Sequence, residues 1–378
     1  MRMELSTVAS ALAIALAAGA STLAAASERA ALKAGPAVKG AGSGFSVAAL
    51  KTPTEGTAYA DNGVMGIAVG DEVGTGIGRF WVGLVEQPGQ YAERNIFFDW
   101  PGSSYLTVRS YTTQTDYISM PPAVAPVPYT VFNIDPYGSL AALGPTGFRT
   151  TYALPGGATT PDALTIQSDV VVHGSTWSNS SVEETVRVTN NGTASVRIGI
   201  RYFWDLMLYQ DDGPTFQAFG PTGPLLVNET DFVAPGFESY ELRDNDDDYV
   251  PRSAYLAVGG TVSGPAWITP APTAPGLLQY VAWSHAAGQS FEYTSDPTYS
   301  IGTPPFGTGH NDAAMLYFFP NGTDGFDIAP GASVTVSASL FLREQPLAGP
   351  IPVTALGALG LAGLAVLLAA AAVIALRA

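Results

Sequence analysis

The chain has 378 residues, 47% of them hydrophobic, and no cysteine. This allows one large core or two smaller ones, and it excludes disulfides, thiolate metal sites and a cysteine nucleophile. The formal net charge is -16 and all three lysines precede residue 52, which argues against nucleic acid as a partner because no basic patch could neutralise phosphates. The 42 glycines and 29 prolines indicate many turns and short strands.

Residues 1–26 are typical of a signal peptide for export. Arg2 precedes an Ala/Leu-rich run, and Ala24-Ala25-Ala26 offers a cleavage site before Ser27. The alternative is an uncleaved anchor helix. Residues 27–44, rich in Gly and Ala, are expected to form a flexible leader.

Residues 45–345 are predicted to form an all-β domain, a large antiparallel two-sheet sandwich. Short apolar or alternating runs separated by turn residues predict strands. These runs are 64–69, 80–85, 104–111, 129–134, 164–172, 255–258, 278–283, 313–319 and 334–342. No long amphipathic stretch suggests a helix, so a βαβ fold is not expected. If the body has two domains instead, the Pro-rich stretch 264–276 is the alternative boundary.

The clearest strand pattern lies in residues 182–208. Even positions are mostly apolar or aromatic and odd positions are mostly polar, which predicts one buried and one wet face. Asn190-Asn191-Gly192 indicates a hairpin between two strands. Face parity favours a three-residue loop with Gly192 left-handed, which would place Val188 opposite Ala194.

Acidic residues are concentrated between positions 205 and 248, with eleven Asp or Glu and a single basic residue. Asp244, Asp246 and Asp248 have the alternate spacing of a 1-3-5 ligand loop for Ca²⁺. The rest of an EF-hand pattern is missing, because tyrosines stand where Gly and the bidentate Glu belong. The alternative is a solvated acidic loop.

The histidines offer no spacing motif, and the sequence assigns no catalytic residue. His285 with Glu292, or His310 with Asp312, could supply the acid and base that an epimerase would need. His173 lies on the polar face of its predicted strand. A structural or surface role is the expectation for each.

Two tryptophans are candidates for stacking on a sugar. Trp100 and Trp267 lie in Pro/Gly-rich loops, where an indole face could contact a glycan. Packing within the loops is the alternative.

The C-terminal segment, residues 346–378, is predicted to anchor the chain in a membrane. The stretch from Val353 to Leu376 carries no charge and is long enough for one transmembrane helix. Arg377 follows it directly. The positive-inside rule then places the body outside the cytoplasm.

This tail resembles a bacterial sorting signal of the PEP-CTERM/IPTL-CTERM kind. The resemblance rests on Pro350-Ile351-Pro352-Val353-Thr354, the run LGALGLAGLAVLL and the terminal arginine. It implies an exosortase-type processing protease as partner, although the motif has no Glu and only one basic residue ends the chain. A plain membrane anchor is the alternative.

Strand count and size make the body similar to carbohydrate-handling supersandwich proteins of the aldose-epimerase type. The expected function is a non-catalytic binding or structural module of a bacterial cell envelope or matrix, with polysaccharide as a partner. The alternatives are a carbohydrate-active enzyme, epimerase- or lyase-like, on the same scaffold, and a Ca²⁺-stiffened structural protein.

Overall fold

The computed structural model describes residues 57–70, 76–85, 95–98, 103–119, 124–208, 212–218, 223, 225–243, 257–301, 312–320 and 325–343. All of them belong to the second of the chain's two units, residues 44–378. The regular structure is almost entirely β. In the described ranges the helices are α3 (Trp283–Ala286) and two 3₁₀ turns, η1 (Asp135–Tyr137) and η2 (Trp177–Asn179), as the missing helical periodicity predicts.

Nine antiparallel strands form the largest sheet, and the predicted large antiparallel sheets are thereby confirmed. Their order across the sheet is β13 (Leu225–Leu226), β12 (Thr215–Ala218), β15 (Ser239–Arg243), β16 (Ala257–Thr261), β20 (Ser333–Leu342), β10 (Ser181–Asn190), β9 (Ala163–His173), β8 (Gly147–Pro155) and β7 (Gly138–Ala142). Along β9 buried and half-buried residues alternate strictly, so one face of this sheet is its inner face.

A second sheet has eight strands and a third has three. The second is ordered β14 (Thr230–Val233), β17 (Leu277–Ala282), β18 (Ala313–Phe319), β11 (Val196–Leu206), β4 (Tyr105–Ser110), β5 (Thr115–Ile118) and β6 (Thr130–Asn133), with β19 (Phe326–Ile328) paired to one end of β11. The third comprises β1 (Thr57–Asp61), β2 (Met65–Gly70) and β3 (Phe80–Leu84). Every apolar run predicted from the sequence overlaps one of these strands.

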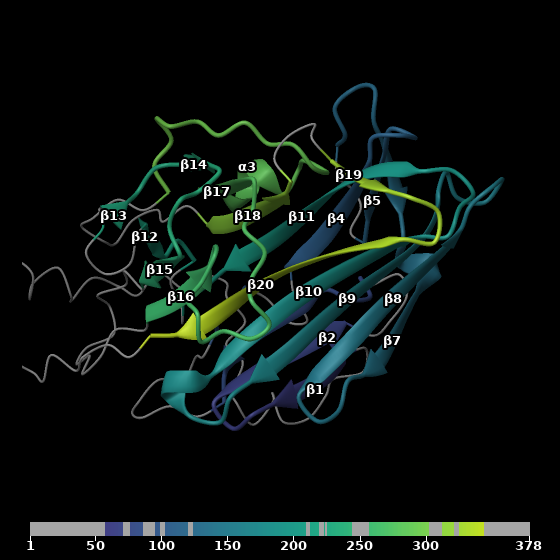
Figure 1. Cartoon of the computed structure of the whole chain (residues 1–378). Helices are drawn as coiled ribbons and strands as arrows, with labels where there is room; N and C mark the ends of the chain where they lie inside the picture. Colours follow the sequence, from purple (N-terminus) through teal and green to yellow (C-terminus); the bar gives the residue numbers. More distant parts are fainter. Residues whose placement is uncertain are drawn as a thin grey trace, which may run out of the picture. The chain divides into compact units, whose positions relative to one another are not determined.

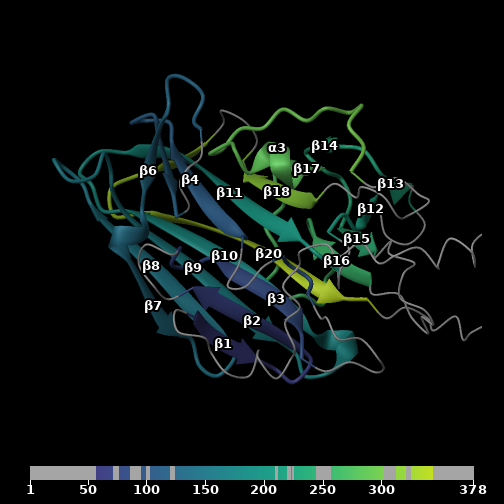
Figure 2. The same cartoon turned by 180° about the vertical axis from the view of Figure 1, so that it is seen from behind.

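The two large sheets share one core, with the three-stranded sheet packed beside it against β8, β9 and β10 (Figures 1 and 2). Polar atoms cross this core as well. The hydroxyl of Tyr202, on β11, accepts the N–H of Val186 on β10 at 3.1 Å and donates to the carbonyl of Val336 on β20 at 2.9 Å. Side chains of β11 therefore reach the backbone of the opposite sheet.

The predicted hairpin at Asn190–Gly192 is wrong. β10 pairs with β9 and β20, whereas β11 pairs with β4, β18 and β19, so the chain crosses from one sheet to the other between them. Val188 lies opposite Ile166 and Val334 rather than Ala194, and Gly192 has no positive φ. The prediction that the even, apolar positions of both strands point into the core is confirmed. The two apolar faces meet across the core, and the strands do not lie side by side in one sheet.

The predicted wet face of β11 is also wrong over most of its length. Arg197 is exposed, but Arg201, Phe203 and Asp205 are fully buried. A further layer, residues 283–301, packs over this outer face. A period of two identifies a face, but it does not reveal what covers that face.

Candidate functional site

Residues 283–301, here called the covering segment, comprise α3 and the chain that follows it. Its apolar side chains and those of the outer face of the eight-stranded sheet form a second buried cluster. The cluster contains Tyr105, Ile118, Phe203, Val281, Ala286, Phe291, Ala314, Leu316 and Phe318. The covering segment is therefore held to the sheet by a core of its own.

A buried arginine fixes the path of the covering segment. Nη1 of Arg201 donates to the backbone carbonyls of Gln289 and Phe291 at 2.9 and 3.1 Å. The rings of Tyr105 and Phe203 stack on each other with centroids 4.8 Å apart, and the guanidinium carbon lies 5.7 and 5.5 Å from these centroids. Burial lowers the pKa of Arg201. A buried charge is costly unless its hydrogen bonds are made, so this arrangement allows little variation at residues 289–291.

A second buried arginine fixes the next residues. Arg109 forms a bidentate ion pair with Asp116 at 2.6 and 2.8 Å, and its Nη1 lies 2.6 Å from Glu292. Ser290 donates to the same Asp116 carboxylate. The ring of Tyr129 lies over the guanidinium at 3.8 Å, a cation–π distance. Glu292, one of the carboxylates considered as a partner for His285, thus forms an ion pair with Arg109 instead.

Glu229 occupies the place where the chain passes from β13, at one edge of the nine-stranded sheet, to β14, at one edge of the other large sheet. Its side chain is buried. The carboxylate accepts the backbone N–H groups of Ala282 and Asp296 at 3.0 and 2.6 Å, and the Tyr293 hydroxyl lies 2.7 and 2.8 Å from its two oxygens. Two main-chain donors and one tyrosine fix this carboxylate in orientation.

His285, on α3, lies beside this carboxylate. Its Nδ1 is 3.4 Å from both the nearer Glu229 oxygen and the Tyr293 hydroxyl, and its side chain is 40% exposed. Tyr299 contacts the imidazole with ring centroids 4.3 Å apart. When Nδ1 carries the proton and donates it to Glu229 or Tyr293, the lone pair of Nε2 is left for another partner.

Tyr293 completes the cluster of Glu229, His285 and Tyr293, here called the Glu–His–Tyr cluster. Burial, reinforced by the hydrogen bond to Glu229, raises the pKa of Tyr293. Its hydroxyl therefore stays protonated near neutral pH and acts as a donor to Glu229. In this arrangement the exposed His285 is the side chain suited to exchanging a proton with a ligand.

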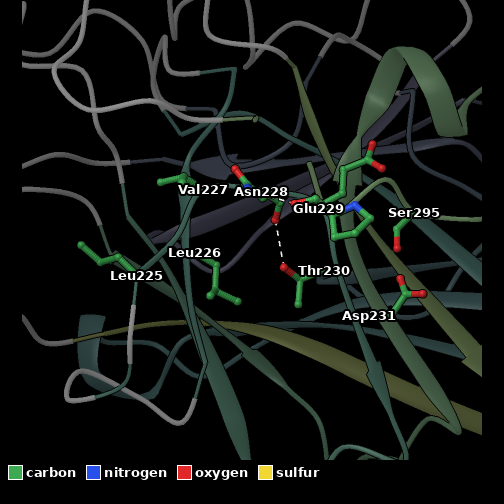
Figure 3. A pocket seen from close by; sticks show the side chains of 9 residues that line it. Leu225, Leu226, Val227, Asn228, Glu229, Thr230, Asp231 and Ser295 are labelled. Carbon is green, nitrogen blue, oxygen red and sulfur yellow. Dashed lines mark hydrogen bonds between the residues drawn. The ribbon is translucent and has the colours of Figure 1, made fainter. Parts of the chain in front are cut away.

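Glu229 also lines an open groove of about 580 Å³, which is the size of many small-molecule sites. The lining residues are Leu225, Leu226, Val227, Asn228, Glu229, Thr230, Asp231, Ser295 and Pro297. Figure 3 shows Leu225 and Leu226 on one side and Asp231 and Ser295 on the other. One wall is therefore apolar and the other offers hydrogen-bonding groups, with the Glu–His–Tyr cluster next to them.

Three further acidic residues lie near the start of α3. The backbone N–H of Trp283 donates to the carbonyl of Asp312 at 2.7 Å. Burial, followed by the charge of Asp312, raises the pKa of Asp205 well above its ordinary value, and burial raises the pKa of Asp212 to about 6. Asp312 is half-buried, and desolvation raises its pKa as well, so all three carboxyl groups titrate above the ordinary range of an aspartate.

Several predicted site residues lie outside the described residues, namely Asp244, Asp246, Asp248, Trp100 and His310. The Ca²⁺ loop and one stacking candidate therefore stay predictions. Within the described ranges no group of three His, Asp or Glu side chains is arranged to hold a metal ion. The predicted signal peptide and the predicted transmembrane segment 353–376 also lie outside the described residues. Among the residues that are described, no helix is long and apolar enough to cross a membrane.

Of the remaining predicted residues, Trp267 is 47% exposed and its ring meets Phe341 edge-on at 5.4 Å. His173 pairs with Glu183 at 2.8 Å on the outer face of the nine-stranded sheet. Glu229 and Tyr293 were missed. Glu229 lies 56 positions before His285 in an ordinary acidic stretch, and only the crossing between two sheet edges brings them together.

No protein-family model matches the chain, and no curated protein matches it by sequence. Solved structures show similarity of fold. A proposed aldose 1-epimerase from Escherichia coli K12 is 12% identical, with 76% of this chain and 98% of that chain covered and a TM-score of 0.42. An aldose epimerase homologue from C. elegans is 9% identical, with 76% and 98% covered and a TM-score of 0.42. A polysaccharide lyase is 10% identical, with 70% and 30% covered and a TM-score of 0.31. The expected fold-level similarity to such β-supersandwich proteins is found, and it concerns the fold alone.

Proposed function

We propose that this chain is a carbohydrate-active enzyme that moves protons to and from a sugar, in an epimerase-like or lyase-like reaction. The observation that carries the proposal is the contact of half-exposed His285 with the buried Glu229 carboxylate, which lines the groove. A histidine, an orienting carboxylate and a neighbouring cavity are the elements of general acid–base catalysis.

The proposal assigns a role to each residue of the cluster and the groove. His285 lies beside the groove and does not line it, so the proposal requires that a sugar bound in the groove extends to Nε2, which then takes a proton from a hydroxyl or carbon of that sugar. The imidazolium that results is stabilised through Nδ1–H by Glu229, whose two backbone donors prevent it from turning away. Tyr293 stays protonated and supports Glu229. Leu225, Leu226 and Pro297 contact the C–H face of the sugar, and Thr230, Asp231 and Ser295 bind its hydroxyl groups.

The test compares two histidine variants of the purified full-length chain. Interconversion of aldose anomers is followed by polarimetry, and chain cleavage by the absorbance of unsaturated products from a panel of polysaccharides. His285→Gln should lower the rate by about 100-fold or more, the range for loss of a general base. His173→Gln, in the other described histidine, should leave it unchanged. Equal activity of His285→Gln and the parent chain would remove the proposal.

A non-catalytic glycan-binding or structural module is the second candidate. It is favoured by Trp267, whose exposed indole is held at a fixed angle against buried Phe341 and could stack on a sugar. Loss of polysaccharide binding in Trp267→Ala, together with no turnover of any sugar by the parent chain, would support this candidate.

We also propose that the chain is exported to the bacterial cell envelope, with the body outside the cytoplasm and residues 353–376 in the membrane. The hydropathy of both ends supports this. An exosortase-type protease and Ca²⁺ at Asp244, Asp246 and Asp248 remain parts of the proposal. The intact mass of the mature protein in each cell fraction tests both ends together, since an unprocessed chain in the cytosol would contradict export.

A further inference from the structure

We propose that the groove takes a sugar that carries a free, protonated amino group, such as a residue of a de-N-acetylated hexosamine polymer. The inference rests on the proposed function for the place of the ligand, but it concerns recognition and not turnover.

The charge of the groove is the first argument. Its nine lining residues include two carboxylates, Glu229 and Asp231, and no Lys, Arg or His. Asp296, between the lining residues Ser295 and Pro297, is exposed; hydrogen bonds from Thr298 hold its pKa below the ordinary value, so it remains charged. A carboxylated sugar would meet repulsion here, whereas an ammonium group would be attracted.

Asp231 is the group placed to bind the amine. Its side chain is exposed in the wall of the groove, and Nε2 of Gln279 donates to one carboxylate oxygen at 2.8 Å. Gln279 is buried, and its amide also donates to the carbonyl of Tyr293 at 3.1 Å. This contact holds the carboxylate at a fixed angle while its second oxygen can accept from an ammonium group.

The opposite wall explains why the ligand is a sugar and not a simple amine. Leu225, Leu226 and Val227 provide apolar surface, and Figure 3 shows the two leucines across from Asp231. A pyranose presents a C–H face to such a wall and its polar substituents to the other. The chain's net charge of -16 adds long-range attraction for a cationic polymer.

The experiment measures binding alone, by calorimetry with the full-length chain. The probes are three hexasaccharides that carry a free amine (β-1,4-linked glucosamine), an acetamide (its N-acetylated form) or a carboxylate (galacturonate). The amine form should bind about tenfold more tightly than the acetamide form, and the difference should shrink as salt rises from about 0.05 to 0.5 M because exposed charges are screened.

Two matched variants locate the effect. Asp231→Asn should weaken binding of the amine form about fivefold, the upper range for an exposed ion pair, and leave the acetamide form unaffected. Glu238→Gln removes an exposed carboxylate that does not line the groove and should change neither. Preference for the acetamide or carboxylate probe, or no binding of the amine probe, overturns the inference.

The two proposals can fail separately. Binding of the amine probe by His285→Gln without turnover of any sugar by the parent chain would leave the inference standing and remove the enzyme. Turnover of neutral sugars, without any preference for the amine probe in binding, would support the enzyme and remove the inference about the amino sugar.

Discussion

The indole N–H of Trp204 donates to a carboxylate oxygen of Glu184 at 2.6 Å, in the core between the two large sheets. Both side chains are fully buried, Trp204 on β11 and Glu184 on β10. Burial raises the pKa of Glu184 to about 8, against an ordinary value of 4.5, and the indole hydrogen bond opposes this rise only in part. The glutamate is therefore protonated in the folded chain at neutral pH.

This pKa predicts a dependence of stability on pH. The folded chain keeps the Glu184 proton that the unfolded chain releases above about pH 4.5, so the stabilising contribution is complete below that pH and is lost as pH rises towards 8. The loss is on the order of 3 to 5 kcal/mol. Glu184→Gln cannot ionise. It should be more stable than the parent chain at pH 8.5, and this advantage should shrink or disappear at pH 4.

The measurement is the midpoint of thermal unfolding between pH 4 and pH 9 for both proteins. Asp205, Asp212 and Asp312 titrate in the same direction, because their pKa values are raised as well, so the parent and the variant should both lose stability as pH rises. Only the difference between them reports on Glu184. A difference that does not vary with pH would show that Glu184 is already ionised in the folded chain.

Gly260, on β16, predicts a packing effect. A Cβ added there would lie 2.0 Å from the ring of Tyr240, and that ring is fully buried with its hydroxyl 2.7 Å from that of Tyr317. Gly260→Ala should therefore destabilise the chain by about 1 to 3 kcal/mol, the usual cost of overpacking. At Gly236 nothing lies within 4 Å of the added carbon, so Gly236→Ala should be close to neutral in denaturant unfolding. Equal stability of the two variants would show that the Tyr240 ring can move.

Strands β10 and β11 show which structural properties can be predicted from the sequence and which cannot. The period of two correctly predicts that Val186 and Tyr202 point inward, because side-chain direction is a local property of a strand. It gives no partner strand, and the Asn-Gly sequence that favours a hairpin serves here in a crossing between sheets. Likewise the charge of Arg201 indicated a wet face, although its hydrogen bonds to the covering segment allow it to be buried.

The site was less predictable than the fold for a similar reason. His285 could be named as a candidate, since histidines are few. Its carboxylate could not, because the position of Glu229 depends on two sheet edges, on the end of β17 and on the path of the covering segment. These are contacts between residues far apart in the chain, and neither the residue spacing nor the composition of the sequence can predict them.

Arg201 and Arg197 provide a matched pair of variants, since they lie four residues apart on the same face of β11. Arg201→Met removes the donors to the carbonyls of Gln289 and Phe291, and loss of hydrogen bonds from a buried charged group should cost about 2 to 4 kcal/mol. Arg197→Met breaks an exposed ion pair with Asp327 and should cost about 1 kcal/mol or less. Hydrogen exchange should also quicken in residues 287–295 of the first variant only. Unchanged exchange there would mean that the apolar cluster alone holds the covering segment.

Tyr293 tests whether Glu229 must be held by more than its backbone donors. Tyr293→Phe keeps the ring but removes the hydroxyl that lies 2.7 and 2.8 Å from the two carboxylate oxygens. Ala282 and Asp296 still donate to Glu229, so the loss of stability should stay near 1 kcal/mol, the usual value for one hydrogen bond. His285 Nδ1 should then have Glu229 as its single hydrogen-bond partner in the cluster, and the NMR signals of the His285 imidazole should shift. If the tyrosine orients the pair, the turnover rate of Tyr293→Phe should fall by about 10-fold or more, although the free energy of unfolding changes little. Unchanged imidazole signals of His285, with full activity, would make Tyr293 a packing residue and leave Glu229 oriented by the main chain alone.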